Sequence, residues 1–158
     1  MKTWFTARVA LFAGMVSLPA TVSPRLAQMN PAPDYRQDPR LNSLKHFFQK
    51  WDCPAWRYAA VFLEAADFYD LDWRLLPSIS YIESTGGKAA RYNNWFGWDS
   101  GRAHFPSTSV GIRTVARTLS QSDLYRDKST DQILALYNPD ADYAQKVKTV
   151  MRRISPSE

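Results

Sequence analysis

A glutamate on an apolar helix face is the first candidate for chemistry in this 158-residue chain, which contains only three glutamates against twelve aspartates. Glu83 follows Ile79 by four positions and Leu76 by seven, so a helix would place these three side chains on one face. It also precedes Gly86 and Gly87, in the last helical turn, where the helix dipole disfavours a carboxylate. Both conditions favour the protonated acid that can donate to a leaving oxygen. The alternative is a glutamate that reaches solvent past the helix end.

The segment that follows is rich in side chains suited to binding sugars. Residues 92–98 contain four aromatic residues and two asparagines. A sugar ring has apolar C–H faces and hydroxyl edges, so its site needs flat aromatic surfaces flanked by amides. We expect Phe96 inside the domain and one of the two tryptophans in a groove; the alternative is that the rings fill a small core and Asn94 shapes a turn. The candidates for substrate contact here are Tyr92, Asn94, Trp95 and Trp98.

The remaining sequence predicts a mainly α domain that positions these residues. Helical periodicity covers about 38–51, 55–69, 108–120, 130–137 and 141–154, and a further helix begins at a cap on Asp72 and stops at Gly86. Residues 88–107 lose this periodicity, which predicts a short β-hairpin or an ordered, irregular loop. We therefore expect one domain over residues 38–158, with an irregular insertion between its helices.

The N-terminal segment has the order of parts that is typical of a secretory signal peptide. Lys2 and Arg8 precede an apolar run from Val9 to Ala20, which is shorter than the ~20 residues needed to span a bilayer. We expect a signal peptide over residues 1–20, an extracytoplasmic location and no stable membrane insertion after cleavage. The alternative is an uncleaved N-terminal anchor. Residues 21–37 contain three prolines, which predicts a linker or irregular arm.

Composition argues against several classes of partner and site. The net charge of +5 comes without a clustered basic run, so nucleic acid is not an expected partner. Cys53 is the only cysteine, which rules out an intrachain disulfide, and with two histidines it does not provide the spacing of a structural zinc site. We expect no metal, no cofactor and a monomer.

Two strings of residues resemble a known family. Tyr-Ile-Glu-Ser-Thr-Gly-Gly-Lys at 81–88, followed by Asn-Asn-Trp-Phe-Gly at 93–97, resembles the glucosaminidase branch of the lysozyme-like superfamily, which includes glycoside hydrolase family 73 and the mannosyl-glycoprotein endo-β-N-acetylglucosaminidase-like domains. The resemblance continues through Phe-Pro-Ser at 105–107, Tyr125 and Tyr-Asn-Pro-Asp-Ala-Asp-Tyr-Ala at 137–144, and it covers about residues 60–154.

The resemblance implies a lysozyme-like fold and cleavage of β-1,4 bonds between amino sugars, in peptidoglycan or a related glycan that contains N-acetylglucosamine. Glu83 is then the general acid, and Tyr137 or Tyr143 stands in the position of the family's cleft tyrosine. The sequence departs from the family in one respect, because the family often has a second acid in a longer lobe after Phe-Gly. Asp99 is the only carboxylate between Gly97 and Phe105.

Asp99 is therefore the candidate base, and its distance from the acid would distinguish two mechanisms. Carboxyl groups about 6.5–9.5 Å apart fit inversion, and groups about 5–5.5 Å apart fit retention. If Asp99 only forms a turn, a single glutamate must suffice, either with help from the substrate's acetamido group or as a lytic transglycosylase that leaves an anhydro product. A catalytically inactive glycan-binding module of the envelope is a further alternative to the hydrolase.

Overall fold

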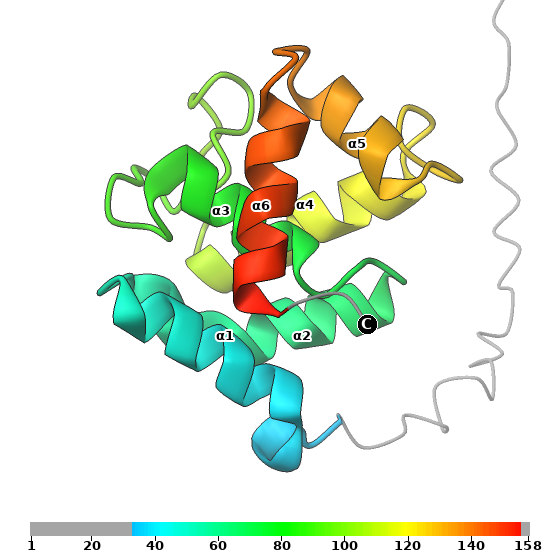
Figure 1. The fold of residues 1–158 in the computed structure, drawn as a ribbon. Coiled ribbons are helices and arrows are strands. Elements are labelled where there is room, and N and C mark those ends of the chain that lie inside the picture. The colour runs from blue at the N-terminus through cyan, green and yellow to red at the C-terminus, as the bar shows by residue number, and fades with distance from the viewer. Residues whose placement is uncertain (1–32, 156–158) are drawn as a thin grey trace, which may run out of the picture. The chain divides into compact units, whose positions relative to one another are not determined.

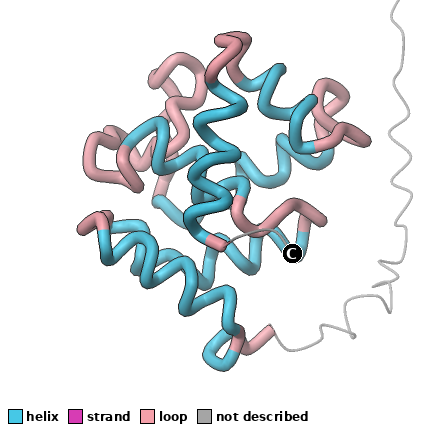
Figure 2. Tube along the Cα trace, in the orientation of Figure 1, coloured by secondary structure: helices cyan, strands magenta, loops and turns pink. Residues whose placement is uncertain are grey.

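The structure is a computed structural model and describes residues 33–155. The expected signal peptide and most of the expected arm lie outside the described residues. Within this range the domain is mainly α, as predicted, and contains no strand (Figures 1 and 2). Its α-helices are α1 (Pro39–Lys50), α2 (Ala59–Phe68), α3 (Leu75–Ser84), α4 (Thr108–Gln121), α5 (Thr130–Tyr137) and α6 (Tyr143–Ile154).

Local capping explains where several of these helices begin. The Asp38 carboxylate accepts a hydrogen bond from the backbone N–H of Arg40 at 2.8 Å, and Pro39 occupies the first helical position of α1. Ser129 and Gln132 form a reciprocal capping box at the start of α5. These starts agree with those predicted from the sequence, because capping depends on neighbouring residues.

The folded domain begins before residue 38, so the predicted end of the linker was wrong. Tyr35–Gln37 forms a 3-10 helix, and the Tyr35 ring is buried in the core. Its hydroxyl donates to the Asp67 carboxylate at 2.9 Å, at the far end of α2. A single aromatic residue has no periodicity, and its partner lies 32 positions away, so sequence pattern did not reveal this contact.

Two helix starts also differ from the prediction. Residues Pro54–Tyr58 form a 3-10 turn before α2 begins at Ala59. The third helix begins at Leu75, because Asp72 instead holds a turn in which its carboxylate accepts from the backbone N–H and the guanidinium of Arg74.

Helix α3 lies at the centre of the domain and carries Glu83 near its end. All of its residues from Leu75 to Ser80 are buried. The helix packs against α6 and α2, while α2 also packs against α1 and α4. Because α3 is buried, its last turn, which carries Glu83, is held rigidly by the surrounding helices. No helix of residues 33–155 is long and apolar enough to cross a bilayer.

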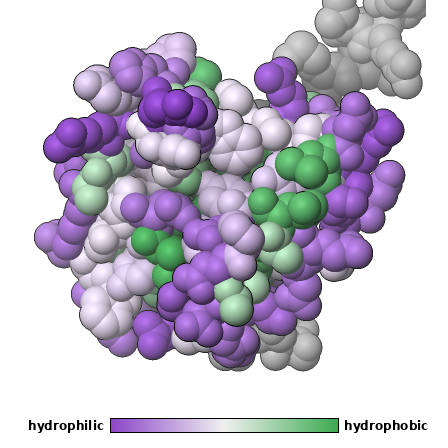
Figure 3. All heavy atoms as spheres, turned by 90° about the horizontal axis from the view of Figure 1, so that it is seen from above, coloured by the Kyte–Doolittle hydropathy of each residue, from purple (hydrophilic) through white to green (hydrophobic). Residues whose placement is uncertain are grey.

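Residues 85–107 form an ordered, irregular loop between α3 and α4, which was one of the two predicted outcomes. Within it, a single β-bridge joins Arg91 and Asn94. The surface seen from above is largely hydrophilic, with hydrophobic side chains exposed in small patches (Figure 3).

Candidate functional site

The chain leaves α3 by a left-handed turn that brings the following loop back over the helix end. Thr85 has φ 53°, and the backbone N–H of Gly86 donates to the Ser80 carbonyl at 3.0 Å. The Ser84 hydroxyl donates to the Trp95 carbonyl at 2.8 Å and accepts from the Gly87 N–H. The end of α3 is thus tied directly to residue 95, in the aromatic segment.

Asn94 holds the next turn of this loop in place. Its side-chain oxygen accepts from the backbone N–H of Trp98, and its side-chain nitrogen donates to the Trp98 carbonyl, both at 2.9 Å. Both the oxygen and the nitrogen of the amide are therefore hydrogen-bonded within the loop. It places Gly97 and Trp98 beside Glu83, where they form one side of a pocket.

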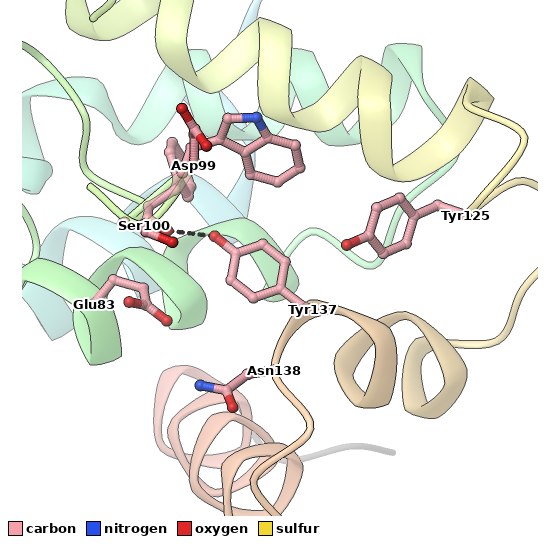
Figure 4. A pocket seen from close by; sticks show the side chains of 9 residues that line it. Glu83, Asp99, Ser100, Tyr125, Tyr137 and Asn138 are labelled. Atoms are coloured by element: carbon pink, nitrogen blue, oxygen red, sulfur yellow. Dashed lines mark hydrogen bonds between the residues drawn. The ribbon is translucent and has the colours of Figure 1, made fainter. Parts of the chain in front are cut away.

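The pocket has a volume of about 310 Å³ and lies between the loop, the end of α3 and the end of α5 (Figure 4). Aromatic rings, hydroxyl groups, carboxyl groups and an amide all reach it. Its lining residues are Glu83, Phe96, Gly97, Trp98, Asp99, Ser100, Tyr125, Tyr137 and Asn138.

The two oxygens of Glu83 have different surroundings. Oε1 accepts a hydrogen bond of 2.7 Å from the hydroxyl of Tyr143. Oε2 lies against Gly97, where an added Cβ would come within 2.6 Å of it. Gly97 has φ +61°, so this position needs glycine for its backbone conformation and for the close approach. No residue of the described chain forms an ion pair with Glu83.

Three tyrosines line or support the pocket. Tyr137 donates to the carbonyl of Phe96 and packs against Trp98, with ring centroids 5.7 Å apart. It also stacks on Tyr143 at 5.9 Å, with the ring planes 9° apart. Burial raises the pKa of Tyr137, and burial followed by the hydrogen bond to Glu83 raises the pKa of Tyr143. Burial likewise raises the pKa of Tyr125. These phenols are therefore neutral donors at ordinary pH.

Asp99 lines the pocket, but its carboxylate is engaged elsewhere. Its Oδ1 accepts a charge-assisted hydrogen bond of 2.6 Å from the guanidinium of Arg102. In Figure 4 this carboxylate points away from that of Glu83. The geometry gives Asp99 the features of an exposed turn residue that is paired with its neighbour.

The structure brings together half of the residues predicted for the site. Glu83, Asp99, Tyr137 and Trp98 line the pocket, and Tyr143 lies behind Glu83 with 4% of its surface exposed. Tyr143 therefore contacts the candidate acid and does not line the pocket itself, and its direct contact with substrate stays a prediction.

Three other residues predicted to contact substrate do not line this pocket. Trp95 is 6% exposed and packs edge-on against Tyr58, with its ring over Gly87. Asn94 is 5% exposed and satisfied within the loop. Tyr92 is 59% exposed, but it stacks on His104 and is not among the lining residues. Residue type alone could not separate rings that face the pocket from rings that fill the core.

Five lining residues were absent from the predicted site: Phe96, Gly97, Ser100, Tyr125 and Asn138. Ser100 and Asn138 follow predicted residues directly in the sequence, and Tyr125 belongs to the strings that carry the resemblance. Their proximity in sequence was the available signal, but only the packing of α5 against the loop shows that they line the same pocket.

Comparison with protein-family models, with curated proteins and with solved structures finds no match to this chain. Within residues 33–155 there is no cluster of three or more histidine, cysteine, aspartate or glutamate side chains that could hold a metal ion.

Proposed function

We propose that this protein cleaves β-1,4 bonds between amino sugars, in peptidoglycan or a related glycan containing N-acetylglucosamine, with Glu83 as general acid. The single observation that supports this proposal most is the state of the Glu83 carboxyl group. One oxygen is held by Tyr143, the other lies at the pocket beside Gly97, and no cation among residues 33–155 pairs with the group. A structural glutamate at a surface usually pairs with a cation or points into solvent.

The proposed step follows from this arrangement. Protonated Glu83 gives its proton to the glycosidic oxygen, the bond from that oxygen to the anomeric carbon breaks, and the leaving sugar departs as an alcohol. The positive charge that develops on the remaining sugar is captured by the carbonyl oxygen of its own acetamido group. A water molecule then attacks the anomeric carbon, the bond from that carbon to the acetamido oxygen breaks to restore the amide, and the water passes one proton to the Glu83 carboxylate.

The walls of the pocket suit a sugar substrate. Trp98 and Tyr137 provide aromatic surfaces for apolar ring faces. Ser100, Tyr125 and Asn138 add hydroxyl and amide groups that can bond to sugar hydroxyls. The order of these parts along the chain supports the proposal of a lysozyme-like glucosaminidase. A glutamate at a helix end comes first, and tyrosines near residue 140 then lie close to it in the fold, with Tyr143 bonded to Glu83 and Tyr137 in the same pocket.

A second candidate function is that of a lytic transglycosylase, which, like the step above, needs no second carboxylate and so agrees with the pairing of Asp99 with Arg102. A base that is occupied by a guanidinium is a poor activator of water. In a transglycosylase the attacking group is a hydroxyl of the same sugar, which forms an anhydro end and passes its proton to Glu83. Mass spectrometry of the products distinguishes the two, because hydrolysis adds the mass of one water to each cleaved bond.

The decisive experiment compares Glu83→Gln with Glu64→Gln on purified peptidoglycan. Glu64 is a matched control because it lies on α2, away from the pocket, and pairs with Arg113 at 2.9 Å. Glu83→Gln should abolish the fall in turbidity and the release of products, while Glu64→Gln should retain activity. Undiminished activity of Glu83→Gln in a folded sample would reject the assignment. Binding of glycans without any cleavage by the wild type would support an inactive glycan-binding module instead.

A further inference from the structure

A second groove runs between α3 and α6, which lie side by side in Figure 1. Its volume is about 260 Å³. Tyr81, Ile82 and Val150 give it an apolar floor, and Lys146 and Arg153 are its only charged lining residues in the described part of the chain.

Two chain segments lead from this groove to residues of the candidate site. Ile82 directly precedes Glu83 on α3. Lys146 follows Tyr143 by three positions on α6, which is nearly one helical turn, and the Tyr143 hydroxyl holds Glu83. The groove and the candidate site therefore share the end of α3 and the start of α6.

The charges of the groove are complementary to an anion. Arg153 is exposed and forms no ion pair with any described residue. Lys146 is also exposed, and its ammonium group lies 3.7 Å from the carboxylate of Asp140, which is the longest ion pair within residues 33–155. The two cations are seven positions apart on one helix, or about 10.5 Å along its axis.

We propose that this groove binds an acidic peptide arm attached to the glycan, with separate carboxylates of the peptide at Lys146 and Arg153. This inference rests on the proposed glycan cleavage and specifies the kind of glycan. Two cations about 10.5 Å apart along α6 require two separated carboxylates, and the apolar floor suits the alkyl side chains of a peptide. A hydroxyl-rich sugar chain satisfies neither condition.

The test uses two substrates and two double variants. The substrates are peptidoglycan that bears its peptide arms and the same polymer after an amidase has removed them. The first variant combines Lys146→Gln with Arg153→Gln. The second combines Arg117→Gln with Lys128→Gln and is a matched control, because both cations are exposed, neither has an ion pair in the described chain, and neither lines the groove.

The Lys146→Gln, Arg153→Gln variant should raise KM for the peptide-bearing polymer on the order of tenfold and leave kcat unchanged. Its KM for the stripped polymer should equal that of the wild type, and the control variant should change neither value. An equal KM for the peptide-bearing polymer in wild type and variant overturns the inference.

A binding measurement separates this inference from the proposed function. The peptides released by the amidase are titrated into Glu83→Gln protein by calorimetry, with and without Lys146→Gln and Arg153→Gln. Binding that disappears in the triple variant supports the groove, and binding that is unaffected or absent overturns it. If the wild type cleaves neither polymer, the proposed function is wrong, and the titration decides the groove by itself.

Discussion

The hydroxyl of Tyr143 donates a 2.7 Å hydrogen bond to Oε1 of Glu83, although the two residues lie 60 positions apart. This contact joins the first residue of α6 to the last turn of α3. It leaves Oε2, the oxygen beside Gly97, without a protein donor in the described chain. The proton that Glu83 donates in the proposed reaction is therefore expected on Oε2.

Replacing Tyr143 by phenylalanine tests this orientation. Tyr143→Phe keeps the ring that stacks on Tyr137 and removes only the hydroxyl. We expect kcat to fall by about tenfold with little change in KM, and the free energy of unfolding to fall by about 1 kcal/mol. Initial rates on peptidoglycan and urea unfolding measure the two effects. A rise in KM at constant kcat would instead show that Tyr143 binds substrate.

The approach of Gly97 to Glu83 gives a second prediction with an internal control. Gly97→Ala and Gly101→Ala both place a Cβ on a residue with positive φ, at +61° and +82°. Each should lose about 1 kcal/mol of stability for that reason. At Gly97 the Cβ would also lie 2.6 Å from Oε2, whereas at Gly101 no atom lies within 4 Å. Only Gly97→Ala should therefore lose most of its activity, and equal loss in both variants would contradict the role of the close approach.

The aromatic residues of the loop should differ in their effect on substrate binding. Trp98→Ala removes a ring from the pocket, and KM should rise by about three- to tenfold, as expected for loss of an aromatic contact. Tyr92→Ala should leave KM unchanged, because Tyr92 stacks on His104 outside the lining residues. Initial rates over a range of glycan concentrations give both values. A larger rise in KM for Tyr92→Ala than for Trp98→Ala would indicate that the substrate binds outside the pocket.

Asn94 should matter for stability because its amide clamps the loop. In Asn94→Asp the carboxylate cannot donate to the Trp98 carbonyl, and it places a negative charge against that oxygen. The free energy of unfolding should fall by about 1–3 kcal/mol. Asn42→Asp, an exposed position on α1, makes the same chemical change and should cost far less. Equal unfolding midpoints for the two variants in urea would argue against the clamp.

The buried tyrosines predict how stability changes at high pH. Folding raises the pKa of Tyr137 and Tyr143, so the unfolded chain loses these protons first, near pH 10. Their contribution to the free energy of unfolding is constant at lower pH. It falls as pH rises above about 10, by up to about 1.4 kcal/mol per pH unit for each tyrosine. Urea unfolding at pH 8 to 11 should show a shallower decline for Tyr143→Phe than for the wild type. An equal decline of the free energy of unfolding with pH in Tyr143→Phe and wild type would contradict the raised pKa of Tyr143.

Features set by short-range sequence were predicted well. Caps and apolar periodicity located the helices because they depend on residues within one or two turns, as at Asp38 and Ser129. The same reasoning placed Glu83 in the last turn of a helix and an irregular aromatic segment after it. Tyr35 was missed because an isolated ring is recognised as part of a core only through a distant partner, here Asp67.

Sequence alone determined that a rare glutamate stands at a helix end beside a segment rich in rings and amides. It could not determine which groups turn toward one another, because that depends on packing between elements far apart in the chain. Only the tertiary structure placed Trp98 in the pocket and Trp95 in the core, and paired Asp99 with Arg102. Only the packing of α6 on α3 brought Tyr143 within hydrogen-bond distance of Glu83, since side chains 60 positions apart meet only when helices pack.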